Sequence, residues 1–283
     1  MVTVAGLIRT VVIVKNPFAI LALRLRKKPV KVTFSNGAVF QITWPQFRSL
    51  RDNYELVKKY NLQQISEDIF KITTGSYQLV GSRVMMYTID EMEAGSYGYD
   101  YRGKVVLDIG GFEGDSAAFF WSRGAKKIVI YEPMLEHHRF IDENISLNKI
   151  NAEVHAEGIG SKDGEITVVY DHADNCFGLE TRGSQNKMII KIKDVTKVIA
   201  ESGADVAKID CEGAEISLID VPKDTLRKLE YVMVETHTPQ IRRQLIEKFK
   251  NSGFVVTQNG NEDKDKEISI ISFKRVDTEV INQ

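Results

Sequence analysis

Residues 105–115 have the sequence VVLDIGGFEGD, in which an apolar run ends at Asp108 and Ile109 and a glycine-rich turn follows. The run predicts a buried strand over residues 105–109, and a helical stretch begins at residue 116. Glycine permits a tight turn between the two and lets backbone N–H groups approach a ligand closely. Ligands of open α/β sheets bind beyond the carboxyl ends of the strands, where this turn lies. We therefore expect a ligand site that includes Asp108, Gly110, Gly111, Phe112 and Gly114.

Strands and helices alternate after this motif. Buried-strand runs occur at residues 128–131, 154–156, 206–209 and 231–234, and helical stretches at 135–148, 213–219 and 240–252. Such alternation predicts right-handed crossovers and a parallel sheet covered on both faces. The runs 254–258 and 268–273 flank Asn259-Gly260 and predict an antiparallel hairpin that closes the sheet. We therefore expect an α/β domain with the Rossmann-like class I methyltransferase fold over residues 101–276, and a tail over 277–283.

The acidic residues of the motif distinguish two classes of nucleotide ligand. Glu132 ends the next strand, where a carboxylate can accept hydrogen bonds from both ribose hydroxyls. A dinucleotide site needs Gly-x-Gly-x-x-Gly facing a pyrophosphate, whereas the order here is Asp-x-Gly-Gly-x-x-Gly. The charge of Asp108 opposes a pyrophosphate and suits the sulfonium and amino group of S-adenosylmethionine. The sequence therefore predicts S-adenosylmethionine as the cofactor, with Glu132, Pro133 and Gly158 in its site, and ranks an NAD-linked oxidoreductase lower.

Residues 208–215, KIDCEGAE, resemble the Lys-x-Asp-x-Glu-Gly-x-Glu motif of FkbM-type methyltransferases, and residues 108–115 are similar to that family's first motif. Residues 144–148 and 158–160 also match in order. Two departures are Gly111, where the family more often has alanine, and Cys211, where it commonly has valine. The resemblance covers residues 100–275 and implies methyl transfer to oxygen, typically a hydroxyl of a small molecule or glycan.

The same motif supplies candidates for catalysis. Asp210 ends the fourth strand, and Glu212 and Glu215 follow at a helix start, where acids are also common for stability alone. A carboxylate in this place can orient an acceptor hydroxyl and take its proton. His237, after the strand 231–234, is the alternative base, with an ordinary pKa of about 6.5. No histidine lies at ligand spacing from the acids, so no metal is predicted. Two other histidines, His137 and His138, are expected to be solvated.

Positive charge is concentrated at the start of the chain. Residues 1–51 contain nine Lys or Arg and no acid, which gives them a charge of +9. The rest of the chain carries −10, and the whole chain has a net charge of −1. An apolar run over residues 18–23 precedes five of these cations and predicts a short helix, which can contact anionic lipid, nucleic acid or an acidic partner. We favour a segment folded back on the acidic body, with Phe18, Ile20, Leu21 and Leu23 buried. Asn36-Gly37 predicts a hairpin and Pro45 a helix start, so residues 1–100 form a small α/β extension that helps to cover the acceptor.

Two other functions compete. The basic start and Asn144-x-x-x-Asn148 favour an RNA methyltransferase, but Asn/Asp-Pro-Pro-aromatic is missing after the fourth strand, and the acids there repel a phosphate backbone. A non-catalytic binding protein of the same fold is disfavoured because Asp108, Glu132 and Asp210 are intact. Cys176 and Cys211 lack metal-ligand spacing and predict a reducing, cytoplasmic location. The sequence contains no stretch of about 18 uncharged apolar residues, so we expect no membrane-spanning helix. The apolar start lacks the basic leader of a signal peptide.

Overall fold

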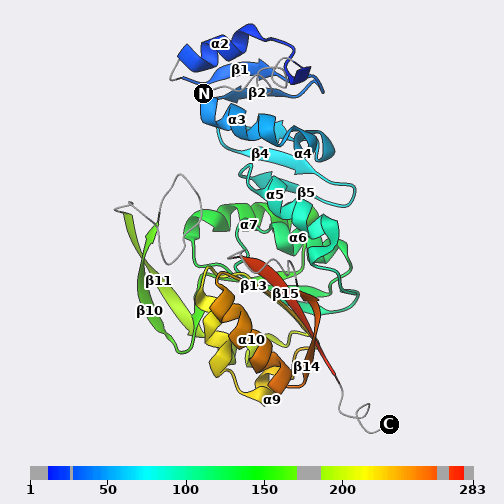
Figure 1. Cartoon of the computed structure of the whole chain (residues 1–283), viewed down its shortest axis with the longest axis vertical. Helices are drawn as coiled ribbons and strands as arrows, with labels where there is room; N and C mark the ends of the chain where they lie inside the picture. Colours follow the sequence, from blue (N-terminus) through cyan, green and yellow to red (C-terminus); the bar gives the residue numbers. More distant parts are fainter. Residues whose placement is uncertain (1–11, 26–27, 171–185, 260–267, 277–283) are drawn as a thin grey trace. The chain divides into compact units, whose positions relative to one another are not determined.

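A computed structural model of the chain describes residues 12–25, 28–170, 186–259 and 268–276. The chain divides into two units, residues 1–94 and 95–283, each with its own packed interior (Figure 1). A helix with a kink at Gly95, η1 (Met92–Ser96), spans the boundary between them, and the φ of Gly95 is 103°. Glycine tolerates this left-handed conformation without the steric penalty that a Cβ brings.

The first unit is a small α/β arrangement. Its elements are α2 (Phe18–Leu25), β1 (Val30–Thr33), β2 (Val39–Ile42), α3 (Trp44–Asp52), α4 (Tyr54–Lys59), β3 (Gln63–Gln64), β4 (Phe70–Thr73), β5 (Gln78–Gly81) and α5 (Met85–Glu91). The predicted hairpin is present as β1 and β2, which pair antiparallel. The predicted helix begins at Trp44, with Thr43 and Gln46 forming a capping box. Its core is aromatic: the ring of Phe34 lies 5.3 Å from that of Phe40 and 5.6 Å from that of Tyr54.

The second unit is organised by a seven-stranded sheet in the order β14-β15-β13-β12-β6-β7-β8. The strands are β6 (Val105–Ile109), β7 (Lys127–Tyr131), β8 (Ala152–His155), β12 (Val206–Ile209), β13 (Tyr231–Thr236), β14 (Phe254–Asn259) and β15 (Ser269–Arg275). The first five in sequence are parallel, and β15 runs antiparallel to both β13 and β14. This is the Rossmann-like class I methyltransferase fold, and the predicted closing hairpin is confirmed.

Helices cover both faces of this sheet (Figure 1). They are α6 (Asp115–Ser122), α7 (Leu135–Asn148), α8 (Val195–Ser202), η2 (Ala214–Asp220), α9 (Lys223–Leu226) and α10 (Pro239–Asn251). Alternate strand residues face opposite sides. Leu107 and Ile109 of β6 belong to one buried cluster with Val198 of α8 and Phe249 of α10, and Val106 lies outside that cluster. The parallel strands are therefore buried on both faces, which accounts for their continuous apolar runs.

Two features differ from expectation. The predicted α-helix at residues 213–219 is a 3₁₀ helix, η2, and Glu212 and Gly213 before it have left-handed backbone conformations. A second, three-stranded sheet was not anticipated: β9 (Gly158–Gly160), β10 (Gly164–Tyr170) and β11 (Asn186–Asp194), in the order β10-β11-β9. Residues 171–185, between β10 and β11, lie outside the described part of the chain. No helix among the described residues has the length and apolar character needed to cross a bilayer.

Candidate functional site

The glycine-rich turn lies directly against the end of β12. The order of strands reverses at β6, which has β7 on one side and β12 on the other. Gly110 has a φ of 77°, and a Cβ at this position would lie 1.7 Å from the carbonyl oxygen of Asp210. A Cβ on Gly111 would lie 2.4 Å from the Cγ2 of Ile130. Only glycine fits at Gly110, because both the backbone angle and the space exclude a side chain.

The backbone donors of this turn are already used within the protein. The N–H groups of Gly110 and Gly111 donate to the carbonyl oxygen of Tyr131 at 2.8 and 3.3 Å, and Gly114 donates to Gly111 at 2.8 Å. The N–H of Phe112, whose φ is 45°, donates to Oε2 of Glu132 at 3.0 Å. A pyrophosphate site depends on such N–H groups pointing at the ligand. The turn therefore does not offer these donors to a dinucleotide.

The surroundings of the turn are acidic and buried. Four carboxylates are at least 95% buried here: Asp108, Glu113, Asp115 and Glu132. Oδ2 of Asp108 accepts a hydrogen bond from the hydroxyl of Ser116 at 2.5 Å, and Oδ1 lies 3.5 Å from the ammonium of Lys208. Burial raises the pKa of Asp108 to about 6, against the opposing effect of Lys208. Asp108 is fully buried, so any effect on a ligand would come from its field and from the shape of the turn.

Lys208 is a site residue that the sequence analysis did not single out, although it opens the KIDCEGAE motif. Its ammonium donates to the carbonyl oxygen of Gly110 at 2.5 Å and lies 3.6 Å from Oδ2 of Asp210. Burial disfavours the charged ammonium, but the carboxylates of Asp210 and Asp108 outweigh burial and raise the pKa of Lys208. Lys208 therefore stays charged and ties the ends of β6 and β12 together.

Glu132 directly follows β7 beside the turn, and its carboxylate is already engaged. Oε1 accepts a hydrogen bond from the N–H of Met134 at 2.8 Å and lies 3.3 Å from Nδ1 of His137. His137 is buried, so its predicted solvation was wrong: the α7 face that carries it turns inward. His138 is also partly buried, with Nε2 at 2.6 Å from the carbonyl oxygen of Glu132.

The other two cofactor candidates meet at the same edge of the sheet. Gly158 lies in β9, and a Cβ there would be 3.7 Å from the Cγ of Pro133, the residue after Glu132. It would also lie 3.1 Å from the Cδ1 of Ile192 in β11. The small sheet thus packs its glycine strand against the segment that follows β7. The structure brings Pro133 and Gly158 together, as the assignment of both to one site requires.

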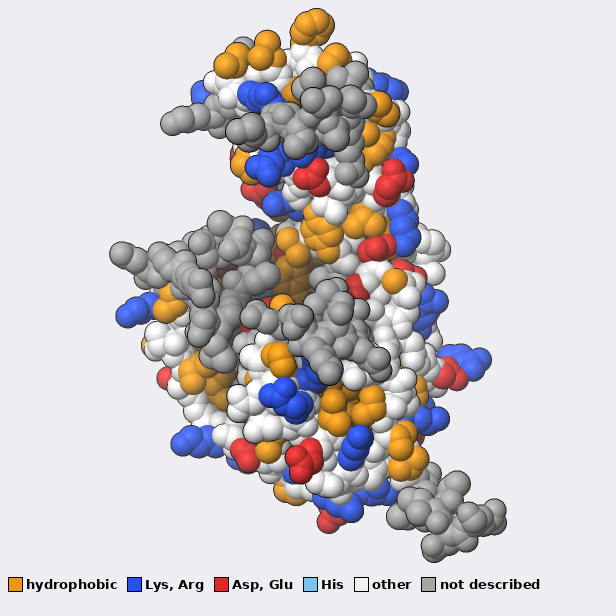
Figure 2. Space-filling view, viewed as in Figure 1, with side chains coloured by type: hydrophobic (Ala, Val, Ile, Leu, Met, Phe, Trp, Pro, Cys, Tyr) orange, Lys and Arg blue, Asp and Glu red, His pale blue; other side chains and the backbone are white. Residues whose placement is uncertain are grey.

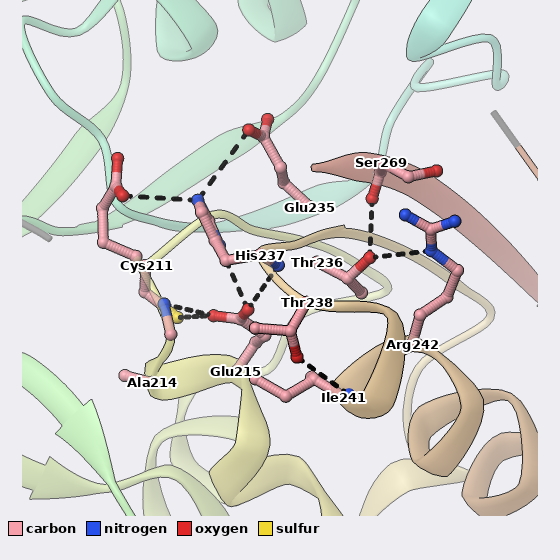
Figure 3. Close-up of polar contacts among 12 residues, drawn as sticks. Cys211, Ala214, Glu215, Glu235, Thr236, His237, Thr238, Ile241, Arg242 and Ser269 are labelled. Atoms are coloured by element: carbon pink, nitrogen blue, oxygen red, sulfur yellow. Dashed lines mark hydrogen bonds and ion pairs between the residues drawn. The ribbon is translucent and has the colours of Figure 1, made fainter. Parts of the chain in front are cut away.

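The acidic motif after β12 closes onto the end of β13 through Glu215 and His237 (Figure 3). The side chain of Glu215 is fully buried. Its Oε1 accepts hydrogen bonds from the N–H of His237 at 3.0 Å and from Nδ1 at 3.1 Å, and Oε2 accepts from the N–H of Gly213 at 2.7 Å. Burial opposes ionisation of Glu215, but the bonds from His237 lower its pKa. An ionised carboxylate can only accept, so Nδ1 of His237 carries a proton.

The other ring nitrogen of His237 faces two further carboxylates. Nε2 lies 3.4 Å from Oε2 of Glu212 and 3.9 Å from Oε1 of Glu235. Burial lowers the pKa of His237, but the hydrogen bond and charge of Glu215, together with Glu212 and Asp210, raise it to about 9. Burial raises the pKa of the Glu212 carboxyl, because it disfavours the charged form, and the positive charge of His237 partly offsets this increase. Glu235 also belongs to this cluster, although it was not among the predicted site residues. It lies near the end of β13, two residues before His237, and only the folded strand shows that its carboxylate lies close to the ring.

Asp210 and Glu212 are the accessible members of the motif. Their side chains are 31% and 42% exposed, whereas that of His237 is 13% exposed. Glu212 has a φ of 53°. Residues with a Cβ adopt this left-handed conformation at a cost of about 1–3 kcal/mol. The chain thus accepts local strain to bring the Glu212 carboxylate beside His237. Asp210, Glu212, Glu215 and His237 form one continuous cluster at the carboxyl ends of β12 and β13.

Three of these residues have the donor set of a metal site. Asp210, Glu212 and His237 can each offer one ligand atom, and the three atoms lie within 4.8 Å of one another. We predicted no metal because no histidine lies at ligand spacing from the acids in the sequence; the fold brings His237 beside Asp210 and Glu212 from the neighbouring strand. The prediction itself remains to be tested.

No protein-family model and no curated protein sequence matches the chain. Solved structures with similar backbones include SMU.776 complexed with SAH, at 12% identity and a TM-score of 0.47, covering 86% of this chain and 69% of that one. Another is the ribosomal protein L11 methylase from Lactobacillus delbrueckii subsp. bulgaricus, at 13% identity and a TM-score of 0.41, covering 68% and 80%. A third is the fibrillarin pre-rRNA processing protein of Methanococcus jannaschii, at 11% identity and a TM-score of 0.42, covering 76% and 96%. These similarities concern the fold alone, and the strand order establishes that fold independently.

Proposed function

We propose that this protein is an S-adenosylmethionine-dependent methyltransferase that acts on a hydroxyl oxygen of a small molecule or glycan. The observation that carries the proposal is the Glu215–His237 pair, which places a ring nitrogen and two carboxylates at the carboxyl ends of β12 and β13. The likeness of residues 108–115 and 208–215 to the FkbM-type motifs supports the same activity.

The charges around the glycine-rich turn support the cofactor. S-adenosylmethionine supplies, when bound, an electrophilic methyl group on a sulfonium cation. The buried carboxylates of Asp108, Glu113 and Asp115 give the turn an acidic field that favours a cation and opposes a pyrophosphate. The turn's N–H groups are satisfied internally, which also disfavours a dinucleotide. Glu132 and Pro133 lie at the end of β7, where the cofactor's ribose would be held, because carboxylate oxygens have lone pairs left for its hydroxyls.

His237 is the residue best placed to accept the acceptor's proton. Glu215 fixes the ring by holding Nδ1–H, so only Nε2 can act as a base. With an acceptor hydroxyl bound beside it, the neutral Nε2 of His237 would take the hydroxyl proton as the oxygen is methylated. A nearby sulfonium disfavours a second positive charge and so lowers the pKa of His237 in the complex. Asp210 and Glu212 are the groups that would orient the acceptor hydroxyl.

Two measurements test this proposal in order. Isothermal titration of the full chain with S-adenosylmethionine, S-adenosylhomocysteine and NAD⁺ tests the cofactor: we expect binding of the first two, and tighter binding of NAD⁺ would overturn the assignment. Transfer of tritiated methyl groups to fractionated small molecules, glycans and RNA then tests the acceptor. Label in a hydroxyl-bearing small molecule or glycan supports the proposal, and label confined to RNA would replace it with the nucleic-acid alternative.

A further inference from the structure

An apolar stripe lies on the outside of helix α2 in the first unit. Phe18, Leu21 and Leu25 are 87%, 60% and 76% exposed, although each is large and hydrophobic. They are spaced three and four residues apart, so they share one face of the helix. Figure 2 shows hydrophobic side chains at the edge of this unit that α2 occupies. The expected burial of Phe18 and Leu21 was therefore wrong, whereas Leu23 is buried as expected.

The opposite side of α2 fixes the stripe in its outward position. Leu23 is 1% exposed and belongs to the unit's interior, and the guanidinium of Arg24 lies 4.9 Å from the centre of the Trp44 ring. The segment before the helix is held to β1, because the side chain of Asn16 accepts from the N–H of Thr33 at 2.8 Å and donates to Lys31 at 3.1 Å. The helix therefore cannot turn its exposed face inward without breaking these contacts.

Lysines lie close to this helix along the chain. Lys15, Lys28 and Lys31 are exposed and lie within six residues of α2 in sequence, and residues 1–51 contain no carboxylate side chain. An exposed apolar stripe flanked by Lys and Arg is the pattern of a helix that lies in the plane of a bilayer. A phosphate backbone would use the cations but would leave three aliphatic or aromatic side chains in water. An acidic protein groove would use both, but the three apolar side chains project at 60% exposure or more from one face of a single short helix, which suits insertion into the plane of a bilayer.

We propose that α2 binds peripherally to an anionic bilayer, with Phe18, Leu21 and Leu25 entering the headgroup boundary and Lys15, Lys28 and Lys31 contacting lipid phosphates or carboxylates. With eight residues, the helix is too short to span a membrane and provides a reversible contact. This inference is independent of the methyl-transfer chemistry and holds whatever the acceptor is. It predicts binding that needs both anionic lipid and the apolar stripe.

Vesicle sedimentation of the full chain tests it. We expect binding to phosphatidylcholine vesicles containing phosphatidylglycerol, and about tenfold or more weaker partitioning to phosphatidylcholine alone. The combined variant Phe18→Gln, Leu21→Gln, Leu25→Gln should lose about tenfold or more of the partitioning to anionic vesicles. The variants Lys28→Glu and Lys31→Glu should each weaken binding about fivefold or more, because roughly 1 kcal/mol is contributed by each cation near the surface.

A matched control replaces Ile166, Ile189 and Val255 of the second unit by Gln, since these residues are 42%, 67% and 43% exposed. This control should bind vesicles like the wild type. Equal loss in the control and the α2 variant would overturn the proposal, because general surface hydrophobicity would then explain binding. Failure of the wild type to sediment with anionic vesicles would also overturn it. A third result would also overturn it: the wild type binds a structured RNA but no vesicles, the charge variants lose the RNA binding, and the stripe variant retains it.

Discussion

The fully buried carboxylate of Glu215 accepts two hydrogen bonds from His237, one from the backbone N–H at 3.0 Å and one from Nδ1 at 3.1 Å. It thereby fixes both the position of the residue after β13 and the tautomer of its ring. The same carboxylate holds the N–H of Gly213 after β12 at 2.7 Å. One buried charge thus links the ends of two adjacent strands to the orientation of the candidate base.

Replacement of Glu215 by Gln should lower the pKa of His237 from about 9 toward its ordinary range, because the neighbouring negative charge is removed. Gly213 would then face an amide donor, so we also expect a stability loss of about 1–3 kcal/mol. An NMR titration of the imidazole and denaturant unfolding measure the two effects. Glu247→Gln, an exposed change on α10, is the control and should alter neither. An unchanged His237 pKa in Glu215→Gln would remove Glu215 from its positioning role.

Folding stability should depend on pH through His237. The folded-state pKa of about 9 is above the ordinary value, so protonation stabilises the folded state. This contribution is complete below about pH 6.5 and is lost as the pH rises through about 9. Urea unfolding at a series of pH values should therefore show a decline over this range in the wild type and a smaller decline in His237→Gln. Parallel curves for the two proteins would contradict the raised pKa.

The value of kcat/KM for methyl transfer should rise with pH toward a plateau near or above pH 9. This parameter reports the pKa of His237 in the free enzyme, and His237 must lose its Nε2 proton to act as a base. In Glu215→Gln the rise should move to lower pH. His237→Gln should lower kcat by roughly 10²–10⁴-fold without a comparable loss of cofactor affinity. A wild-type rate in His237→Gln would shift the role of base to Glu212 or Asp210.

Asp210→Asn should leave cofactor affinity nearly intact but lower stability by about 1–3 kcal/mol, because Asp210 is the main charge partner of buried Lys208. Methyl transfer should fall by roughly 10²-fold, because misplacing the acceptor hydroxyl that Asp210 orients costs an effect of this size. Thermal unfolding, cofactor titration and steady-state rates separate these effects. If the rate stays normal with an identified hydroxyl acceptor, Asp210 serves only to neutralise Lys208.

Gly110→Ala should prevent folding or destabilise the second unit by about 3 kcal/mol or more, because its Cβ would overlap the carbonyl oxygen of Asp210. The matched control is Gly164→Ala in β10, where nothing lies within 4 Å of the added carbon and φ is ordinary. We expect the control to change stability by about 0.5 kcal/mol or less. Calorimetry of both variants checks the comparison, and equal melting temperatures would contradict the close contact.

Dialysis against EDTA should leave methyl transfer unchanged if His237 is a base rather than a ligand. Its Nε2 cannot accept a proton and coordinate an ion at the same time. A loss of activity that Mg²⁺ or Mn²⁺ restores would instead assign Asp210, Glu212 and His237 to a metal.

The sequence predicted the features that depend on local pattern. The strand at Val105–Ile109, the turn after it and the terminal hairpin were all evident, because buried parallel strands are continuous apolar runs bounded by glycine. Contacts between distant strand ends were not accessible. The bond between Glu215 and His237 crosses 22 residues and exists because β12 and β13 are neighbours in the sheet.

Burial on helices was the other limit. His137 was assigned to solvent because its helix was predicted to lie at the surface, yet it contacts Glu132 from the inner face of α7. Conversely, Phe18 and Leu21 were assigned to the interior because they are apolar, although they are exposed. Hydrophobic residues are often exposed in folded proteins, so composition alone does not settle burial.

The position of β15 has a consequence for how the chain folds during synthesis. This strand, Ser269–Arg275, lies between β13 and β14, although both are translated before it. Until residues 269–275 leave the ribosome, the outer edge of β13 has no neighbour, and β14 has no strand to pair with. Unpaired edges of this kind invite association with other chains. The sheet therefore closes only late in translation, and a nascent chain halted before residue 269 should be prone to aggregate and to recruit chaperones.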